Sequence, residues 1–213
     1  MDIPIEEYFS MPTYPSAARR LVRFASRPLN PSLRLILAFI WMFSIGVPVF
    51  AQTPVVGDKA PDFTLPTPSG KGVTMSSEQQ GQGLILVVLR GYPGYQCPYC
   101  VRQVHDFVKH ASDFAAKNTR VLLVYPGPPA NLDQHAKEFL EKQAHLPADI
   151  VLVTDPDYKV TNLYGLRWNE PNETAYPSTF ILDKKGMVVF EKISRGHGDR
   201  LSAQDALDHL AAQ

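Results

Sequence analysis

The sequence predicts an α/β domain in which helices cover both faces of a mixed β-sheet. Within residues 52–213, short apolar runs alternate with amphipathic helical patterns, and two apolar runs near the C-terminal end are joined by a tight polar turn. Strands that alternate with helices form sheets buried on both faces, and a closing hairpin adds antiparallel strands. We therefore expect a three-layer α/β/α domain with a mixed central sheet and an N-terminal β-hairpin.

The strands are predicted from the apolar runs. Phe63 and Leu65 alternate with polar neighbours, and a Pro-Ser-Gly-Lys-Gly turn separates them from Val73-Thr-Met75, which predicts the N-terminal hairpin. The run Leu84–Leu89 is continuous, as expected for a central strand covered on both faces. Further strands are expected at Val121–Tyr125, Ile150–Val153, Thr179–Leu182 and Met187–Phe190, the last two as a hairpin around Asp183-Lys-Lys-Gly186.

Helices are predicted where apolar residues recur at spacings of three and four. The first runs from Cys100 to about Lys117, and the second follows Asn131, with Gln134 placed to complete a capping box. A short helix over residues 157–164 ends at Gly165 and leads into a loop over residues 166–176. The last helix begins at the cap Ser202, with Asp205 three residues later.

Residues 1–51 resemble a secretory signal, and residues 52–213 form the single domain. Five arginines against three acidic residues in 1–34 precede an uncharged stretch over 35–50, and Val49-Phe-Ala51 supplies a small-x-small cleavage site. An uncleaved anchor is the alternative, in which case this segment is the one contact with the membrane. In both cases we expect an exported protein, in the periplasm or on the outer face of the inner membrane of a bacterium.

The formal net charge is zero and hydrophobic residues make up 45% of the chain, which favours a packed globular domain. A balanced charge does not indicate a basic surface that would bind nucleic acid, so we expect no nucleic-acid partner. The sequence contains two cysteines, Cys97 and Cys100, at the turn between the predicted strand Leu84–Leu89 and the following helix. A Cys-x-x-Cys pair in this position is typical of a dithiol/disulfide redox site.

The two sulfurs are expected to differ. Cys97 falls at the helix N-terminus, where free N–H groups favour a thiolate, whereas Cys100 begins the buried stripe and should be the less accessible sulfur. A structural disulfide between them would close too small a loop to add much stability. A metal site is also disfavoured, because His105 and His110 lie on different helix faces. We expect no metal and no cofactor.

Four segments resemble the thioredoxin superfamily, and specifically the redoxin branch of alkyl hydroperoxide reductase and thiol-specific antioxidant (peroxiredoxin-like) proteins, over residues 56–212. They are Gly57-Asp-Lys-Ala-Pro-Asp-Phe-Thr-Leu65, Arg90-Gly91, Cys97-Pro-Tyr-Cys100 and Tyr176-Pro-Ser-Thr-Phe-Ile-Leu-Asp183. The resemblance implies a thioredoxin-like fold with Pro177 as a cis-proline opposite the dithiol. It also implies a substrate groove formed by Pro98, Tyr99, Arg90, Tyr176 and Pro177.

Two enzymatic hypotheses follow. The favoured one is thiol–disulfide exchange, in which Cys97 attacks a disulfide and Cys100 releases the partner. The alternative is a thiol peroxidase, because Pro93 to Cys100 also fits the peroxiredoxin pattern Pro-x-x-x-Thr/Ser-x-x-Cys with Cys97 in the Thr/Ser position. Cys100 would then be peroxidatic and Cys97 resolving. The hydroxyl and the arginine that peroxiredoxins carry are replaced here by Cys97 and Pro177, which disfavours this alternative.

A non-enzymatic binding module on a thioredoxin scaffold is the third hypothesis, disfavoured because both cysteines are present. The expected partners are protein or small-molecule disulfides and thiols, or peroxides, together with an external thiol that supplies electrons. Thioredoxins carry a buried acid in the strand before the motif, but Leu84–Leu89 has none, so Glu78 or water is the candidate for proton transfer. The histidines at positions 135, 145, 197 and 209 are expected on the solvated surface.

Overall fold

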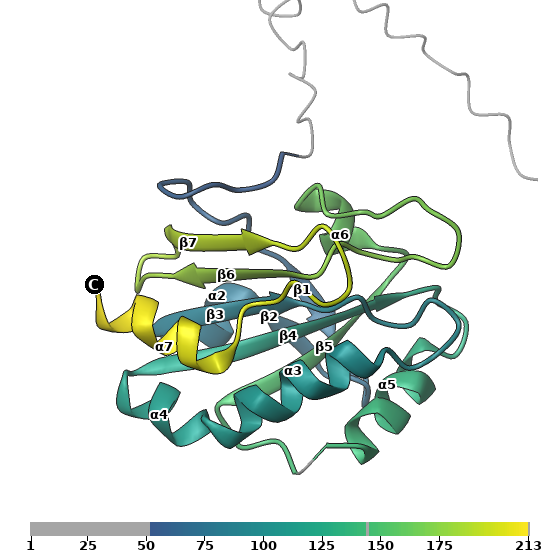
Figure 1. Cartoon of the computed structure of the whole chain (residues 1–213), viewed down its shortest axis with the longest axis horizontal. Coiled ribbons are helices and arrows are strands. Elements are labelled where there is room, and N and C mark those ends of the chain that lie inside the picture. Colours follow the sequence, from purple (N-terminus) through teal and green to yellow (C-terminus); the bar gives the residue numbers. More distant parts are fainter. Residues whose placement is uncertain (1–51, 144, 213) are drawn as a thin grey trace, which may run out of the picture. The chain divides into compact units, whose positions relative to one another are not determined.

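A five-stranded mixed sheet forms the centre of the computed structural model, which describes residues 52–143 and 145–212 (Figure 1). The strand order is β5–β4–β3–β6–β7, with β3, β4 and β5 parallel and β6 and β7 antiparallel to their neighbours. The strands are β3 (Gly83–Val88), β4 (Thr119–Gly127), β5 (Ile150–Pro156), β6 (Ser178–Leu182) and β7 (Val188–Ile193). The predicted mixed sheet is confirmed.

Helices and a hairpin complete the other two layers. The helices are α2 (Met75–Gln79), α3 (Pro98–Lys109), α4 (Ala111–Ala116), α5 (Leu132–Glu141), α6 (Lys159–Leu163) and α7 (Ala203–Ala211). The predicted N-terminal hairpin is present as β1 (Thr64–Pro66) and β2 (Gly72–Thr74). None of the helices among the described residues is long and apolar enough to cross a membrane. The predictions for residues 1–51 lie outside the described residues.

The side chains of the sheet divide between two hydrophobic cores. In β3, Ile85 and Val87 pack against α3, α4, α5 and α7, whereas Leu84, Leu86 and Val88 face the hairpin, α2 and α6. All five of these side chains are at most 1% exposed. Burial on both faces explains why this strand has a continuous apolar sequence, and it gives the predicted three-layer arrangement.

Three local predictions differ from the structure. The single helix to Lys117 is broken at His110, whose backbone leaves the helical region and whose ring Nδ1 lies 2.9 Å from the Asp106 carbonyl oxygen. The capping box at Asn131 is wrong, because this residue adopts φ of 58° and makes no side-chain cap. The short helix α2 was not predicted, since five residues carry too little periodicity.

The last helix begins as predicted. The hydroxyl of Ser202 accepts a hydrogen bond from the Asp205 backbone N–H, and the Asp205 carboxylate accepts one in return from the Ser202 N–H. This reciprocal capping box satisfies two of the N–H groups that a helix start leaves unpaired. It also fixes where the chain turns into α7 directly after the loop that reaches the cysteines.

Candidate active site

The cysteine pair lies where β3 gives way to α3, at the carboxyl end of the parallel strands. Cys97 is the N-cap of α3, with Pro98 as the first helical residue, and its carbonyl accepts a hydrogen bond from Val101. Cys100 lies in the first turn and packs into the core beside β3. Both thiols are free. The structure therefore places the pair on the strand–helix turn that the sequence predicts.

The loop that leads to the pair is held by a close backbone approach at Gly91. Its φ is +74°, and a Cβ on this residue would come within 1.9 Å of the Pro126 carbonyl oxygen. The same oxygen accepts a hydrogen bond from the Tyr92 N–H at 2.9 Å. Only glycine combines this conformation with this contact, so Gly91 fixes the path of the loop against β4.

The expectation that Cys97 is the accessible sulfur is wrong. Cys97 is 1% exposed and Cys100 0% exposed, so both are covered by the surrounding protein. An N-cap residue is normally near the surface, but here the loop after β7 lies over it and brings Arg200 within hydrogen-bonding range of its sulfur. The sulfurs differ in charge rather than in exposure.

Hydrogen bonding lowers the pKa of Cys97 to about 5. The main cause is the hydrogen bond from the Cys100 thiol, and backbone N–H groups at the start of α3 and the charge of Arg200 act in the same direction, against the opposing effect of burial. Burial raises the pKa of Cys100 well above its ordinary value, as does the neighbouring Cys97 sulfur. The Cys97 thiol therefore ionises more readily than the Cys100 thiol, and the backbone N–H groups at the helix start contribute to this difference in the direction that the sequence predicts.

Arg200 is a site residue that the sequence did not indicate. Its Nη2 lies 3.8 Å from the Cys97 sulfur, while Nη1 donates to Gln103 Oε1 at 2.9 Å and Nε donates to the His197 carbonyl at 2.7 Å. Arg200 is far from the motif in sequence and has no pattern of its own. The structure places it just after the Gly-rich segment Ser194–Asp199, in the loop that follows β7.

Arg90, predicted in the groove, instead joins two loops. Its side chain is 1% exposed and donates to the Glu173 carboxylate, to the Tyr95 hydroxyl at 2.9 Å and to the Asn172 carbonyl at 2.6 Å. In addition, the Thr174 hydroxyl donates to the Arg90 carbonyl. None of these partners is a cysteine. Arg90 therefore ties the loop over residues 166–176 to the end of β3.

Pro177 is not a cis-proline. None of the peptide bonds in the described part of the chain is cis, so the bond between Tyr176 and Pro177 is trans. Trans is the lower-energy isomer, and a proline directly before β6 has no N–H that the sheet would need. Its carbonyl accepts a hydrogen bond from Ser194 at 2.8 Å, which ties the loop after β7 to the start of β6.

The other predicted groove residues form part of an aromatic cluster beside the Arg200 loop. Tyr176 stacks on Trp168 with ring centres 4.7 Å apart, and Trp168 meets His197 edge-on at 5.4 Å. Tyr99, next to Pro98 at the start of α3, is 40% exposed, and its ring centre lies 6.2 Å from that of His197. The role of these residues in binding a substrate stays a prediction.

Two of the histidines expected on the surface are built into the site's surroundings. His197 is hydrogen-bonded through Nε2 to Glu173 at 2.9 Å, and its side chain is 34% exposed. His135 stacks on Tyr92 with ring centres 3.7 Å apart and is 23% exposed. His209 also packs, against Phe190. Single histidines in a sequence carry no signal for such contacts.

Glu78 cannot transfer protons to the pair. It forms an ion pair with Arg120 near the start of β4, whereas the cysteines follow the opposite, carboxyl end of β3. The buried hydroxyl on the cysteine side is Tyr125, which donates to Gln96 Oε1 at 2.8 Å. Burial and the nearby Cys100 sulfur raise the pKa of Tyr125, so it stays protonated at neutral pH.

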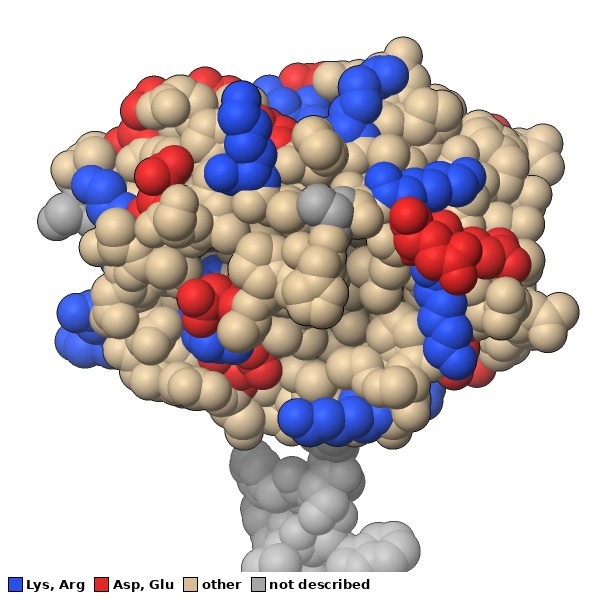
Figure 2. Space-filling model, turned by 90° about the horizontal axis from the view of Figure 1, so that it is seen from below, with Lys and Arg blue, Asp and Glu red and all other residues tan. Residues whose placement is uncertain are grey.

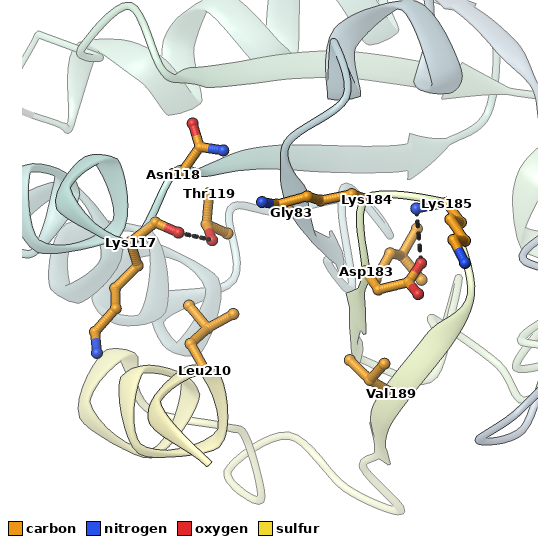
Figure 3. Close-up of a pocket in the computed structure, with 10 residues that line it drawn as sticks. Gly83, Lys117, Asn118, Thr119, Asp183, Lys184, Lys185, Val189 and Leu210 are labelled. Atoms are coloured by element: carbon orange, nitrogen blue, oxygen red, sulfur yellow. Dashed lines mark hydrogen bonds between the residues drawn. The ribbon is translucent and has the colours of Figure 1, made fainter. Parts of the chain in front are cut away.

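A cavity of about 660 Å³ lies far from the cysteines, at the end of the sheet where β3 and β4 begin. Figure 3 shows Thr119, Asp183 and Leu210 around it, with Lys117 and Lys185 at its margin. It contains neither cysteine. Among the residues that the structure describes, no group of three or more His, Cys, Asp or Glu side chains is placed to hold a metal ion.

Charged side chains of both signs are interspersed on the face seen in Figure 2, and no large patch of one sign gathers there. A nucleic-acid-binding surface needs clustered Lys and Arg. The face seen in this view does not show such a cluster.

Comparison with known proteins identifies the family. The model of the AhpC/TSA family matches residues 56–191. The chain belongs to the AhpC/TSA family. A Mycobacterium tuberculosis protein that its name assigns to the peroxiredoxins is 29% identical over 138 residues, which cover 62% of this chain and 81% of that protein.

Solved structures agree on the fold. The crystal structure of peroxidoxin BcpB from Mycobacterium tuberculosis matches with a TM-score of 0.60 and 22% identity, over 75% of this chain and 97% of that chain. The thiol peroxidase from Chromobacterium violaceum matches with a TM-score of 0.59 and 17% identity, over 78% and 90%. At these identities the similarity shows the shared thioredoxin-like fold.

This AhpC/TSA member is an oxidoreductase that acts on thiols or peroxides. The non-enzymatic hypothesis is therefore set aside. Of the two enzymatic hypotheses, the relatives support thiol peroxidase better than the thiol–disulfide exchange that the sequence favoured. The missing hydroxyl and arginine favoured exchange, but the similarity to the family extends over residues 56–191.

Proposed function

We propose that this protein is a thiol peroxidase in which Cys97 attacks the peroxide and Cys100 resolves the product. The observation that carries the proposal is the position of the Cys97 sulfur at the N-cap of α3 with Nη2 of Arg200 3.8 Å away, since a helix N-terminus and a guanidinium both favour a thiolate there. Family membership supports peroxide as the substrate. The order of the sulfurs is the reverse of the order that the peroxiredoxin pattern implies, because the thiolate is the nucleophile.

The proposed cycle has three steps. The Cys97 thiolate attacks one peroxide oxygen, the O–O bond breaks, and the departing alkoxide or hydroxide takes a proton from solvent, which leaves a sulfenic acid on Cys97. The Cys100 thiol then attacks this sulfur, and a disulfide forms as water departs. Two equivalents of an external thiol reduce the disulfide, because these two cysteines are the whole thiol supply of the chain.

Burial of the pair also favours a peroxide. A peroxide molecule is small enough to reach a sulfur that is 1% exposed, whereas a protein disulfide must present its sulfur in line with an accessible thiolate. Thiol–disulfide exchange remains the second candidate function. The observation that favours it is Cys97 at the N-cap of α3 with Cys100 one turn later, which is the arrangement of a dithiol exchange site.

Turnover measurements separate the two functions. With hydrogen peroxide and a small external thiol, the wild-type protein should consume peroxide catalytically, and Cys97→Ser should consume none above background. In an insulin-reduction assay the wild type should show little activity. Rapid insulin reduction without peroxide consumption would reverse the ranking of the two candidates.

We also propose that residues 1–51 direct export and that the domain acts outside the cytoplasm, in the periplasm or on the outer face of the inner membrane of a bacterium. Support comes from the basic segment, the uncharged stretch and the Val49-Phe-Ala51 site. Expression of the full chain followed by cell fractionation and N-terminal sequencing tests this. A mature protein beginning near residue 52 is expected, and an uncleaved protein in the cytoplasmic fraction would contradict it.

A further inference from the structure

We infer that Arg200 is the positioning residue for the attacking sulfur: its guanidinium holds the Cys97 thiolate in place and stabilises the negative charge that the reaction moves. The inference rests on the proposed function and extends it to a residue outside the motif. Among the hydrogen bonds of the described residues, the contact of Arg200 with Cys97 is the one that joins a guanidinium to a cysteine sulfur.

The guanidinium is held in place by contacts that do not involve the sulfur. Nη1 donates to Gln103 Oε1 at 2.9 Å and Nε donates to the His197 carbonyl at 2.7 Å, which leaves Nη2 directed at Cys97. Gln103 is itself 8% exposed and donates to the Leu201 carbonyl, so its oxygen is a fixed acceptor. A planar group held at two nitrogens presents the third in one direction.

The loop that carries Arg200 is attached on two sides. On the sheet side, Ser194 donates to the Pro177 carbonyl, and Asp199 forms an ion pair with Lys192 of β7 at 2.7 Å. On the helix side, Gly198 lies against Tyr99, because a Cβ at Gly198 would come within 3.2 Å of the ring. These contacts place the guanidinium over the N-terminus of α3 and maintain the 3.8 Å contact with the sulfur.

Two other arginines near the site have different partners. Arg90 is paired with Glu173 and holds the loop over residues 166–176. Arg102 stacks over the Tyr99 ring at 4.5 Å. Pro177, where the family resemblance implies an arginine, has no charge. The cation for Cys97 therefore comes from the loop after β7.

The chemistry requires such a cation. As the thiolate attacks, negative charge passes from sulfur to the departing oxygen, and a fixed positive group beside both stabilises the transition state. A guanidinium does not give up a proton in proteins, so the departing oxygen is protonated by solvent. Arg200 thus acts on the Cys97 sulfur through its positive charge and by holding the thiolate in position.

The experiment compares Arg200→Met, Arg200→Lys and the control Arg102→Met, which removes the same charge from an exposed position. The pH dependence of iodoacetamide alkylation at Cys97, resolved by mass spectrometry, gives the apparent pKa of that thiol in each protein. Arg200→Met should raise it by about one unit, the lower end of the shift that a removed neighbouring charge causes, because the charge of Arg200 lowers the pKa of Cys97 less than the hydrogen bond from Cys100 does. Arg200→Lys should bring the pKa of Cys97 part of the way back to the wild-type value. Arg102→Met should give the same alkylation profile as the wild type.

Single-turnover oxidation by hydrogen peroxide provides the second readout. Arg200→Met should slow it at least tenfold even at a pH where Cys97 is fully ionised, whereas a purely structural role would leave that rate unchanged in a folded variant. An unchanged alkylation profile in Arg200→Met with retained thermal stability overturns the inference. A shifted profile in a protein whose wild type does not react with peroxide supports the positioning role while rejecting the peroxidase.

Discussion

Replacing Cys100 by alanine tests the electrostatic asymmetry of the pair. The hydrogen bond from the Cys100 thiol is the largest influence that lowers the pKa of Cys97 to about 5. A hydrogen bond to a charged acceptor contributes about 1.5–3 kcal/mol, and one pKa unit corresponds to about 1.4 kcal/mol. Loss of this donor should therefore raise the pKa of Cys97 by about 1 to 2 units, to between about 6 and 7.

Thiolate absorbance in the ultraviolet, followed against pH, measures this shift directly. At pH 6 the thiolate fraction in Cys100→Ala should fall about two- to tenfold relative to a sulfur with a pKa near 5. Cys100→Ser is the matched control, because its hydroxyl can still donate to the Cys97 sulfur, and its profile should stay within about half a unit of that of wild-type Cys97. An alanine variant that titrates like the serine variant would refute the assignment of this hydrogen bond as the dominant cause.

Other predictions concern stability and the loop contacts. The pKa of Cys97 is lower in the folded protein, at about 5, than in the unfolded chain, where it lies near 8.5. Ionisation of Cys97 therefore stabilises the folded protein fully at pH values above about 8.5. This contribution is lost as the pH falls through about 5. Under reducing conditions the free energy of unfolding from urea titrations should rise between pH 6 and 8 by up to about 1.4 kcal/mol per unit, and less steeply in Cys97→Ser; equal slopes would contradict this. Gly91→Ala, which places a Cβ against the Pro126 carbonyl, should cost about 3 kcal/mol or more in the same titration, and a loss under 1 kcal/mol would show that the loop relaxes easily. Arg90→Met should destabilise the protein by about 3–5 kcal/mol by leaving the Glu173 carboxylate without its buried partner, and should leave the thiolate titration of Cys97 in place; a shifted titration in a stable variant would assign Arg90 to the chemistry.

The sequence predicted the parts of the fold that depend on local patterns. The strand before the cysteines was recognisable because both its faces are buried, which makes Leu84–Leu89 apolar throughout. Ser202 and Asp205 form the expected capping box because that motif is complete within four residues. The cysteine pair was predicted because its signal is also local: the spacing of the two cysteines and their place between a strand and a helix can be read from one short segment.

What the sequence missed depends on distant contacts. Arg200 reaches Cys97 from the loop after β7, and its acceptors are a side chain of α3 and a backbone carbonyl, none of which leaves a pattern in the sequence. The burial of Cys97 was missed for the same reason, because a covering loop is a tertiary feature. Arg90 was predicted in the groove, but its side chain is buried against Glu173, and the bond before Pro177 was predicted to be cis but is trans.

The most direct test of the account is to find which sulfur becomes oxidised first. Cys100→Ser and Cys97→Ser would each be treated with one equivalent of hydrogen peroxide in the presence of dimedone, which traps sulfenic acids, and mapped by mass spectrometry. We expect a dimedone adduct on Cys97 in the Cys100→Ser protein and no rapid adduct on Cys100 in the Cys97→Ser protein. A fast adduct on Cys100 in Cys97→Ser would contradict it and restore the order that the peroxiredoxin pattern implies.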